Sequence, residues 1–114
     1  MILSNEAKDA MLQGLADELN VDVNASLIIY IDADEAAIFD MPNPIEQSIT
    51  GGVFTFNLPQ RSFALLSGTP TTAKLINGLG VIIAEFTIGG EIALDKPAFY
   101  LGGYVNITGL KITI

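Results

Sequence analysis

The chain has 114 residues, of which 50% are hydrophobic and 16% are charged, and its formal net charge is −8. This length fits one domain with one hydrophobic core. Cysteine, histidine and tryptophan are absent, which excludes disulfides, zinc–thiolate sites and catalysis by a histidine base.

The negative charge is concentrated in the N-terminal part of the chain. Residues 1–46 hold ten acidic residues and one lysine (net −9), whereas residues 47–114 hold three acidic and four basic residues (net +1). The acidic part would repel the phosphates of nucleic acids and anionic lipids. No apolar run approaches the ~20 residues of a membrane-spanning helix, and the first residues lack the basic-then-apolar pattern of a signal peptide. We therefore expect neither nucleic acid nor a membrane as a partner.

Residues 4–19 have the one convincing helical pattern in the sequence. Ser4 or Asn5 is a suitable N-cap, and acidic residues in the first turn complement the helix dipole. One stripe of apolar residues at helical spacing consists of Met11, Leu12, Leu15 and Leu19. We predict a helix over 4–19 whose stripe faces either the chain's own core or a partner protein.

Period-two patterns take over from residue 25 onward. The β-branched run at 26–31 predicts a buried strand, and the acidic segment 32–44 is expected to be a loop with a short Ala-Ala-Ile-Phe insert. Further strands are predicted at 47–58 (interrupted by Gly51-Gly52), 62–66, 72–76, 80–88 and 91–94.

Turn signals separate these strands. Asn77-Gly78 predicts a turn, and Gly89-Gly90 predicts a two-residue hairpin between its flanking strands. After the first glycine pair, side chains on one face of the strand should be those of Phe54, Phe56 and Leu58.

The last segment contains a change of parity. Val105 and Ile107 are at odd positions, whereas Leu110, Ile112 and Ile114 are at even positions. A single strand directs both sets toward one core only if an extra residue is inserted. We therefore predict a bulge or a bend at Thr108-Gly109.

These elements predict a mostly-β fold. About seven or eight short strands, with turns every ~8–12 residues, are typical of a β-sandwich or small barrel of antiparallel strands. We expect residues 1–114 to form a single domain, with the helix at 4–19 and the β-sandwich at 25–114.

No residues form a catalytic motif. Asp32, Asp34 and Glu35, with Asp40 nearby, are the densest carboxylate cluster, and such hard oxygen ligands suit Ca²⁺ or Mg²⁺. The segment lacks the EF-hand pattern, so we favour a solvated acidic loop and expect no metal or other cofactor. Because serine, threonine and lysine side chains have no base beside them in any recognisable pattern, we predict that the protein is not an enzyme.

The high apolar fraction predicts burial against other protein surfaces. Tyr30, Phe99, Tyr100 and Tyr104 are candidates to line a ligand groove, although core or interface anchoring is the commoner role of such residues. We expect a homo-oligomer. The candidate interface residues are Met11, Leu12, Leu15, Leu19, Tyr100 and Tyr104.

The N-terminal helix, the strand Leu27-Ile28-Ile29-Tyr30 and the segment 103–114 (GYVNITGLKITI) resemble a family of small virion proteins of tailed bacteriophages. Some members of that family are capsid decoration, or cement, proteins. The acidic residues 31–35 depart from the family's pattern, which has a Gly/Thr/Pro turn there. The resemblance implies a structural protein without catalytic residues.

That resemblance also implies partners and a location. It predicts contacts with further copies and with other virion proteins such as the major capsid protein, after synthesis in the host cytoplasm. The acidic charge favours the outer capsid surface over a position next to packaged DNA. A tail, neck or baseplate protein is the main alternative, and a carbohydrate-binding module or an adhesin subunit is a further one.

Overall fold

The computed structural model describes residues 2–114, and within them it contains one helix and ten strands. The helix is α1 (Asn5–Leu19). The first sheet has the order β2-β1-β6-β7 and contains β1 (Ser26–Ile31), β2 (Asp34–Asp40), β6 (Thr72–Ile76) and β7 (Ile82–Thr87). The second sheet has the order β3-β4-β10-β8 and contains β3 (Glu46–Thr50), β4 (Val53–Phe56), β8 (Ile92–Leu94) and β10 (Ile107–Thr113). A small sheet pairs β5 (Ser62–Phe63) with β9 (Tyr104–Val105).

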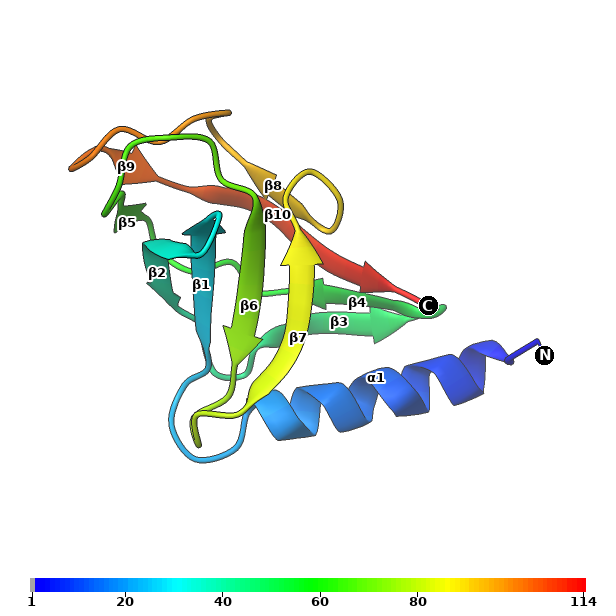
Figure 1. Ribbon diagram of the computed structural model, residues 1–114. Helices are drawn as coiled ribbons and strands as arrows, with labels where there is room; N and C mark the ends of the chain where they lie inside the picture. Colours follow the sequence, from blue (N-terminus) through cyan, green and yellow to red (C-terminus); the bar gives the residue numbers. More distant parts are fainter. Residues whose placement is uncertain (1) are drawn as a thin grey trace.

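The predicted mostly-β fold is confirmed. Strands account for 44% of the chain and helix for 13%, the pairings between strands are antiparallel, and no sheet closes into a barrel. Figure 1 shows the strands of the first sheet crossing those of the second at a steep angle, with α1 alongside the second sheet. One core cluster draws its buried side chains from α1 and from both sheets.

The predicted helix is confirmed to within one residue. Ser4 is its N-cap, and the Ser4 hydroxyl accepts a hydrogen bond of 3.1 Å from the N–H of Ala7. Further hydrogen bonds join the two ends of α1 to the β3–β4 hairpin and the residue before it, among them those of Asp9 and Asn20. The Gly52 N–H donates to Asp9 near the start of the helix (2.8 Å), and the Ile45 N–H donates to Asn20 at its end (2.8 Å). Along the described chain, α1 is too short and too polar to cross a membrane.

The prediction of a loop at 32–44 is wrong for most of that segment. Residues 34–40 form β2, which pairs with β1 around a two-residue turn at Asp32-Ala33. Asp32 has a φ of 54°, a left-handed conformation that aspartate tolerates better than most residues. A bulge at Ala36 directs the side chains of both Ala36 and Ala37 into the core. The segment therefore begins with acidic residues but continues as a strand with a buried face.

The strand predicted at 47–58 is a hairpin. Gly51 and Gly52, both with positive φ, form the turn between β3 and β4. Phe54 and Phe56 are buried with their rings 4.4 Å apart. The prediction that Leu58 shares their face is wrong: Leu58 is exposed because β4 ends at Phe56.

The hairpin predicted at Gly89-Gly90 is wrong. β7 belongs to the first sheet and β8 to the second, and the bridge between Ile88 and Ile92 is parallel. The glycine pair is therefore the point at which the chain passes from one sheet to the other. The strand predicted at 62–66 is also shorter than expected, since only Ser62 and Phe63 pair with β9.

The predicted C-terminal bulge is confirmed. Ile107 pairs with Leu94 and Gly109 pairs with Ala93, which leaves Thr108 as the extra residue. The bulge places Ile107 and Leu110, of opposite parity, in the same core, where each is at most 5% exposed.

Candidate protein-interaction surfaces

The acidic cluster singled out in the sequence does not form a site. Asp32, Asp34 and Glu35 are all exposed, and neighbouring side chains along β2 point to opposite faces of the sheet. Among residues 2–114 no group of three or more acidic side chains could hold a metal ion. The buried polar side-chain atoms of this part of the chain all have hydrogen-bond partners.

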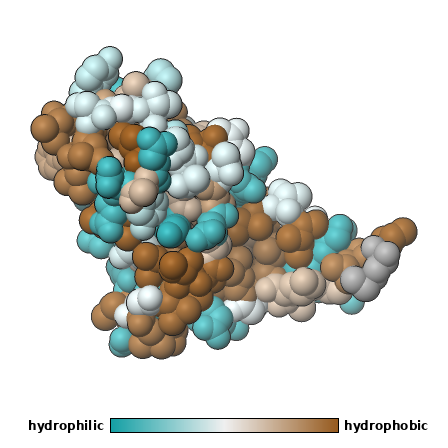
Figure 2. Space-filling view, viewed as in Figure 1, coloured by the Kyte–Doolittle hydropathy of each residue, from teal (hydrophilic) through white to brown (hydrophobic). Residues whose placement is uncertain are grey.

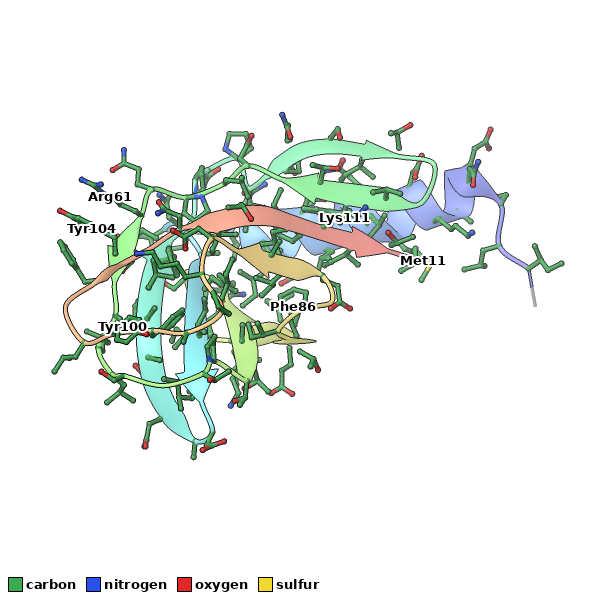
Figure 3. The ribbon with its side chains drawn as sticks, turned by 90° about the horizontal axis from the view of Figure 1, so that it is seen from above. Met11, Arg61, Phe86, Tyr100, Tyr104 and Lys111 are labelled. Atoms are coloured by element: carbon green, nitrogen blue, oxygen red, sulfur yellow. The ribbon has the colours of Figure 1, made fainter. Side chains whose placement is uncertain are left out.

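Exposed apolar side chains instead gather at one end of the molecule around the small sheet. We name this surface the aromatic patch, and its members are Phe63, Leu65, Tyr100, Leu101 and Tyr104. Tyr100 and Leu101 are the most exposed, at 73% and 70%. Figure 3 shows Arg61, Tyr100 and Tyr104 together at this end, with their side chains directed away from the body.

The aromatic patch is held in a defined shape. β5 places Phe63 opposite Tyr104, with their ring centroids 4.9 Å apart. The Arg61 guanidinium lies 3.8 Å above the ring of Tyr104, within the range of a cation–π contact. The loop that carries Tyr100 and Leu101 is fixed by backbone hydrogen bonds between Ala64 and residues 102–103, and by the Leu101 N–H, which donates to the Ser67 hydroxyl.

A second group of exposed apolar side chains lies on the loop between β6 and β7 and on the segment after α1. We name it the loop patch, and its members are Val23, Leu79, Val81 and Ile82, each at least 50% exposed. In Figure 2 it contributes to the brown surface at the lower end of the molecule.

One buried side chain shapes the loop patch. Asn77 is 5% exposed, and its Oδ1 accepts hydrogen bonds from the N–H groups of Leu79 (3.0 Å) and Val81 (2.9 Å). Gly78 is pressed against the backbone of Val21 and Val23, where a Cβ atom would lie only 2.3–2.7 Å from backbone atoms. Leu79 and Val81 are therefore presented to solvent by a loop with little freedom to move.

The two patches lie at opposite ends of the first sheet (Figure 1). Gly68, just before β6, is bridged to Phe99 beside the aromatic patch, whereas Asn77 directly follows β6 at the other end. The five residues of β6 span about 17 Å. The patches are therefore separate surfaces.

Acidic side chains border both patches. The segment after α1 that contributes Val23 to the loop patch is preceded by the exposed acids Asp17, Glu18 and Asp22. The aromatic patch borders the cation Arg61, which lies over Tyr104, but Leu65 is hydrogen-bonded to Ala36 beside the exposed Glu35, and Asp40 lines a groove together with Arg61.

A groove of about 570 Å³ runs between the edge of β2 and residues 58–62. Its floor includes Phe39 and Met41, and the charged side chains of Asp40 and Arg61 line it. The Ser62 hydroxyl donates a 2.7 Å hydrogen bond to the carbonyl of Ile38 and so ties the two walls together.

The interface residues predicted from the sequence are only partly brought together. Tyr100 and Tyr104 both belong to the aromatic patch. In the helix stripe, Leu12 and Leu19 are buried and Leu15 is packed against the core, which is the arrangement expected if the helix faces the chain's own sheets. Met11 is 58% exposed, and Figure 3 places it at the opposite end of the molecule from both tyrosines.

The predicted aromatic groove lining does not form. Phe99 is buried in the core, and Tyr30 is partly buried in β1, where the Lys74 ammonium lies 5.1 Å from its ring centroid. The sequence reasoning missed Phe63, Leu79 and Val81 as surface residues.

Comparisons with protein-family models, with curated proteins and with solved structures found no match for this chain. Function is therefore inferred from the two patches and the charges around them.

Proposed function

We propose that the protein is a structural component of a tailed-bacteriophage virion and acts as a decoration (cement) protein on the outer surface of the head. The observation that carries the proposal is the pair of ordered apolar patches exposed by a small acidic domain. Such patches are typical of protein docking surfaces. The similarity of residues 27–30 and 103–114 to small phage virion proteins directs the proposal to a virion.

The charge and the repetition of a capsid both favour this role. A net charge of −8 would be repelled by packaged DNA but is compatible with the outer surface. Each exposed leucine or aromatic side chain that becomes buried contributes about 1.5–3 kcal/mol before the costs of association. Copies that also touch one another on a repeating lattice gain affinity from multivalency.

The test is addition of the purified protein to phage heads assembled without it, followed by sedimentation and cryo-electron microscopy. We expect stoichiometric binding to the head surface, with a higher temperature of head disruption. Tyr104→Asp should abolish binding, whereas Gln47→Asp, which adds the same charge at an exposed position on β3, should not. Binding to tails alone would assign the protein to the tail, neck or baseplate, and binding to neither would refute a virion role.

A further inference from the structure

We infer that Asn77-Gly78 is a site of spontaneous deamidation, and that the native loop suppresses the reaction until the loop opens. The only co-reactant is water, and the product is a chain that cannot rebuild the loop patch. This inference concerns the isolated chain and is independent of the place proposed for it on the capsid.

The chemistry begins with a dipeptide that occurs once in the chain, since Asn77 is the one asparagine that a glycine follows. The backbone nitrogen of Gly78 bonds to Cγ of Asn77 and the bond between Cγ and Nδ2 breaks. The proton that the Gly78 nitrogen loses leaves with Nδ2 as ammonia, and a five-membered imide remains. Glycine hinders this attack least because it has no Cβ atom, and asparagine is among the thermolabile residues of proteins.

Water then opens the imide at one of its two carbonyls, so that the net change is the exchange of ammonia for water. Opening at Cγ leaves an aspartate in an otherwise unchanged main chain. Opening at the main-chain carbonyl of residue 77 leaves an isoaspartate, whose main chain runs through Cβ and Cγ and is one carbon longer.

The fold requires this labile dipeptide. At position 77 an acceptor is needed for the N–H groups of Leu79 and Val81, which both donate to Oδ1. At position 78 any Cβ atom would clash with the backbone of Val21 and Val23. Because each position has its own structural reason, neither residue can be exchanged for a more stable one without loss of the loop's shape.

The native geometry opposes closure of the imide ring. For the Gly78 nitrogen to reach Cγ, the peptide unit between Asn77 and Gly78 must rotate. That unit is fixed, because the Asn77 carbonyl accepts a 3.0 Å hydrogen bond from the Gly80 N–H and because Gly78 is packed against the backbone of Val21 and Val23. The two N–H groups at Oδ1 would stabilise the oxyanion of the intermediate, but only after the nitrogen has reached Cγ. The reaction therefore proceeds from the opened loop, at a rate set by the population of the open form.

Conversion in the open form prevents the loop from closing again. The extra main-chain carbon of an isoaspartate displaces Gly78 from its contact with Val23, and the N–H groups of Leu79 and Val81 lose the acceptor that the native side chain supplies. The loop patch is then lost for good, because the hydrolysis is not reversed on refolding.

The test compares the full chain in mildly alkaline buffer with the same chain in guanidinium chloride above its unfolding midpoint. Conversion of each asparagine is followed over time by peptide mapping with mass spectrometry. In denaturant we expect Asn77 to convert faster than every other asparagine of the chain. In native buffer its conversion should be at least about tenfold slower, because the open form is a minor population.

Thr50→Asn supplies a matched control within the same molecule. It places a second Asn-Gly pair in the exposed turn between β3 and β4, where Gly51 borders open space. The two pairs should react at similar rates in denaturant. In the native protein, whose fold circular dichroism checks, position 50 should react faster than Asn77.

Four results would overturn the inference. Conversion of Asn77 at equal rates with and without denaturant would show that the fold does not protect it, and no conversion in denaturant would show that it is not a deamidation site. A native position 50 as slow as Asn77 would mean that the contacts of Gly78 are not the cause of the protection. The isoaspartate fraction, purified and refolded, should unfold at a lower denaturant concentration than the unconverted protein, and an unchanged midpoint would contradict the loss of the loop.

Discussion

Asn77 is the side chain on which the shape of the loop patch depends. Its Oδ1 accepts from two backbone N–H groups, and its own N–H donates to the carbonyl of Val81. Asn77→Ala removes the acceptor and leaves two partly buried donors without a protein partner. We expect a loss of about 1–3 kcal/mol in the free energy of unfolding, measured by urea denaturation.

The matched control for that change is Asn24→Ala. Asn24 is exposed and makes no hydrogen bond in the described part of the chain, so its loss should change stability by less than about 0.5 kcal/mol. Equal effects of the two substitutions would show that the Asn77 bonds do not hold the loop.

Asp95 provides a prediction about pH. The Asn106 side-chain amide donates to Asp95 (2.9 Å) and the Asn106 backbone N–H donates to it as well (3.1 Å), and the side-chain bond is the largest cause that holds the pKa of Asp95 below its ordinary value. A lowered pKa means that the ionised form is stabilised by folding. The contribution is therefore full above the unfolded-state pKa of about 3.9, and it is lost as the pH falls through the folded-state value.

Asn106→Ala should raise the pKa of Asp95 toward its ordinary value, as followed by an NMR titration of the carboxyl carbon. The stability difference between this variant and the wild type should shrink once the pH is low enough to protonate Asp95. An unchanged pKa would mean that the side-chain bond does not persist in solution.

Alanine substitutions at Gly51 and Gly52 separate the cost of backbone strain from the cost of a steric clash. Both have positive φ (60° and 80°), so an alanine costs about 1–2 kcal/mol at either position. A Cβ at Gly52 would also lie 2.8 Å from Lys8 Cδ and 3.0 Å from the Ile114 carbonyl, whereas at Gly51 it would meet open space. We expect Gly52→Ala to be more destabilising than Gly51→Ala by about 1 kcal/mol or more in thermal unfolding, and the reverse order would contradict this packing.

At the scale of elements, α1 is a core helix with one exposed apolar residue. Leu12 is 3% exposed and its neighbour Met11 is 58% exposed. Leu12→Ala should reduce the free energy of unfolding by about 2–5 kcal/mol, whereas Met11→Ala should change it by less than about 0.5 kcal/mol. Urea unfolding followed by circular dichroism measures both. Similar losses would mean that α1 packs on a different face in solution.

The sequence predicted those elements whose signals are local. The cap at Ser4 with the stripe after it located α1, and the parity change around Thr108 located the bulge in β10. β2 was missed because its first residues are acidic, and its buried alanines carry a weak strand signal. The Gly89-Gly90 hairpin was wrong because neighbouring strands usually pair, and only the tertiary packing determines that β8 joins the other sheet.

The residues of the candidate surfaces also divide into those with a local signal in the sequence and those whose exposure depends on tertiary packing. Tyr100 and Tyr104 lie beside the Gly102-Gly103 turn, so their exposure was foreseeable, and they were predicted as interface residues. Val81 falls within the strand predicted at 80–88, and neither it nor Leu79 is predicted as a surface residue, because sequence patterns treat an apolar residue as buried. Whether such a residue faces the core or solvent depends on the side chain of Asn77 and the contact of Gly78 with Val23, and neither is visible in the sequence.

At the scale of the whole molecule, the dimensions are 44 × 29 × 22 Å. Figure 1 shows why the long axis exceeds the others: α1, the β3–β4 hairpin and the end of β10 project together from the body of the first sheet. The buried side chains nevertheless form one continuous cluster. The projecting part and the body therefore share a core.

The small sheet is tied to the body by hydrogen bonds, although it lies at the edge. The Leu65 N–H donates to the Ala36 carbonyl of β2, and Gly68 and Phe99 exchange two backbone hydrogen bonds of 3.0 and 2.7 Å. The chain has three tyrosines and no tryptophan, and two of the tyrosines belong to the aromatic patch. Tyrosine fluorescence therefore reports mainly on the small sheet, whereas far-UV circular dichroism reports on every strand. We expect the two signals to give the same urea midpoint, as two-state unfolding requires. A tyrosine transition at lower urea would show that the aromatic end opens before the body, and that the hydrogen bonds of the small sheet do not hold the aromatic patch in place.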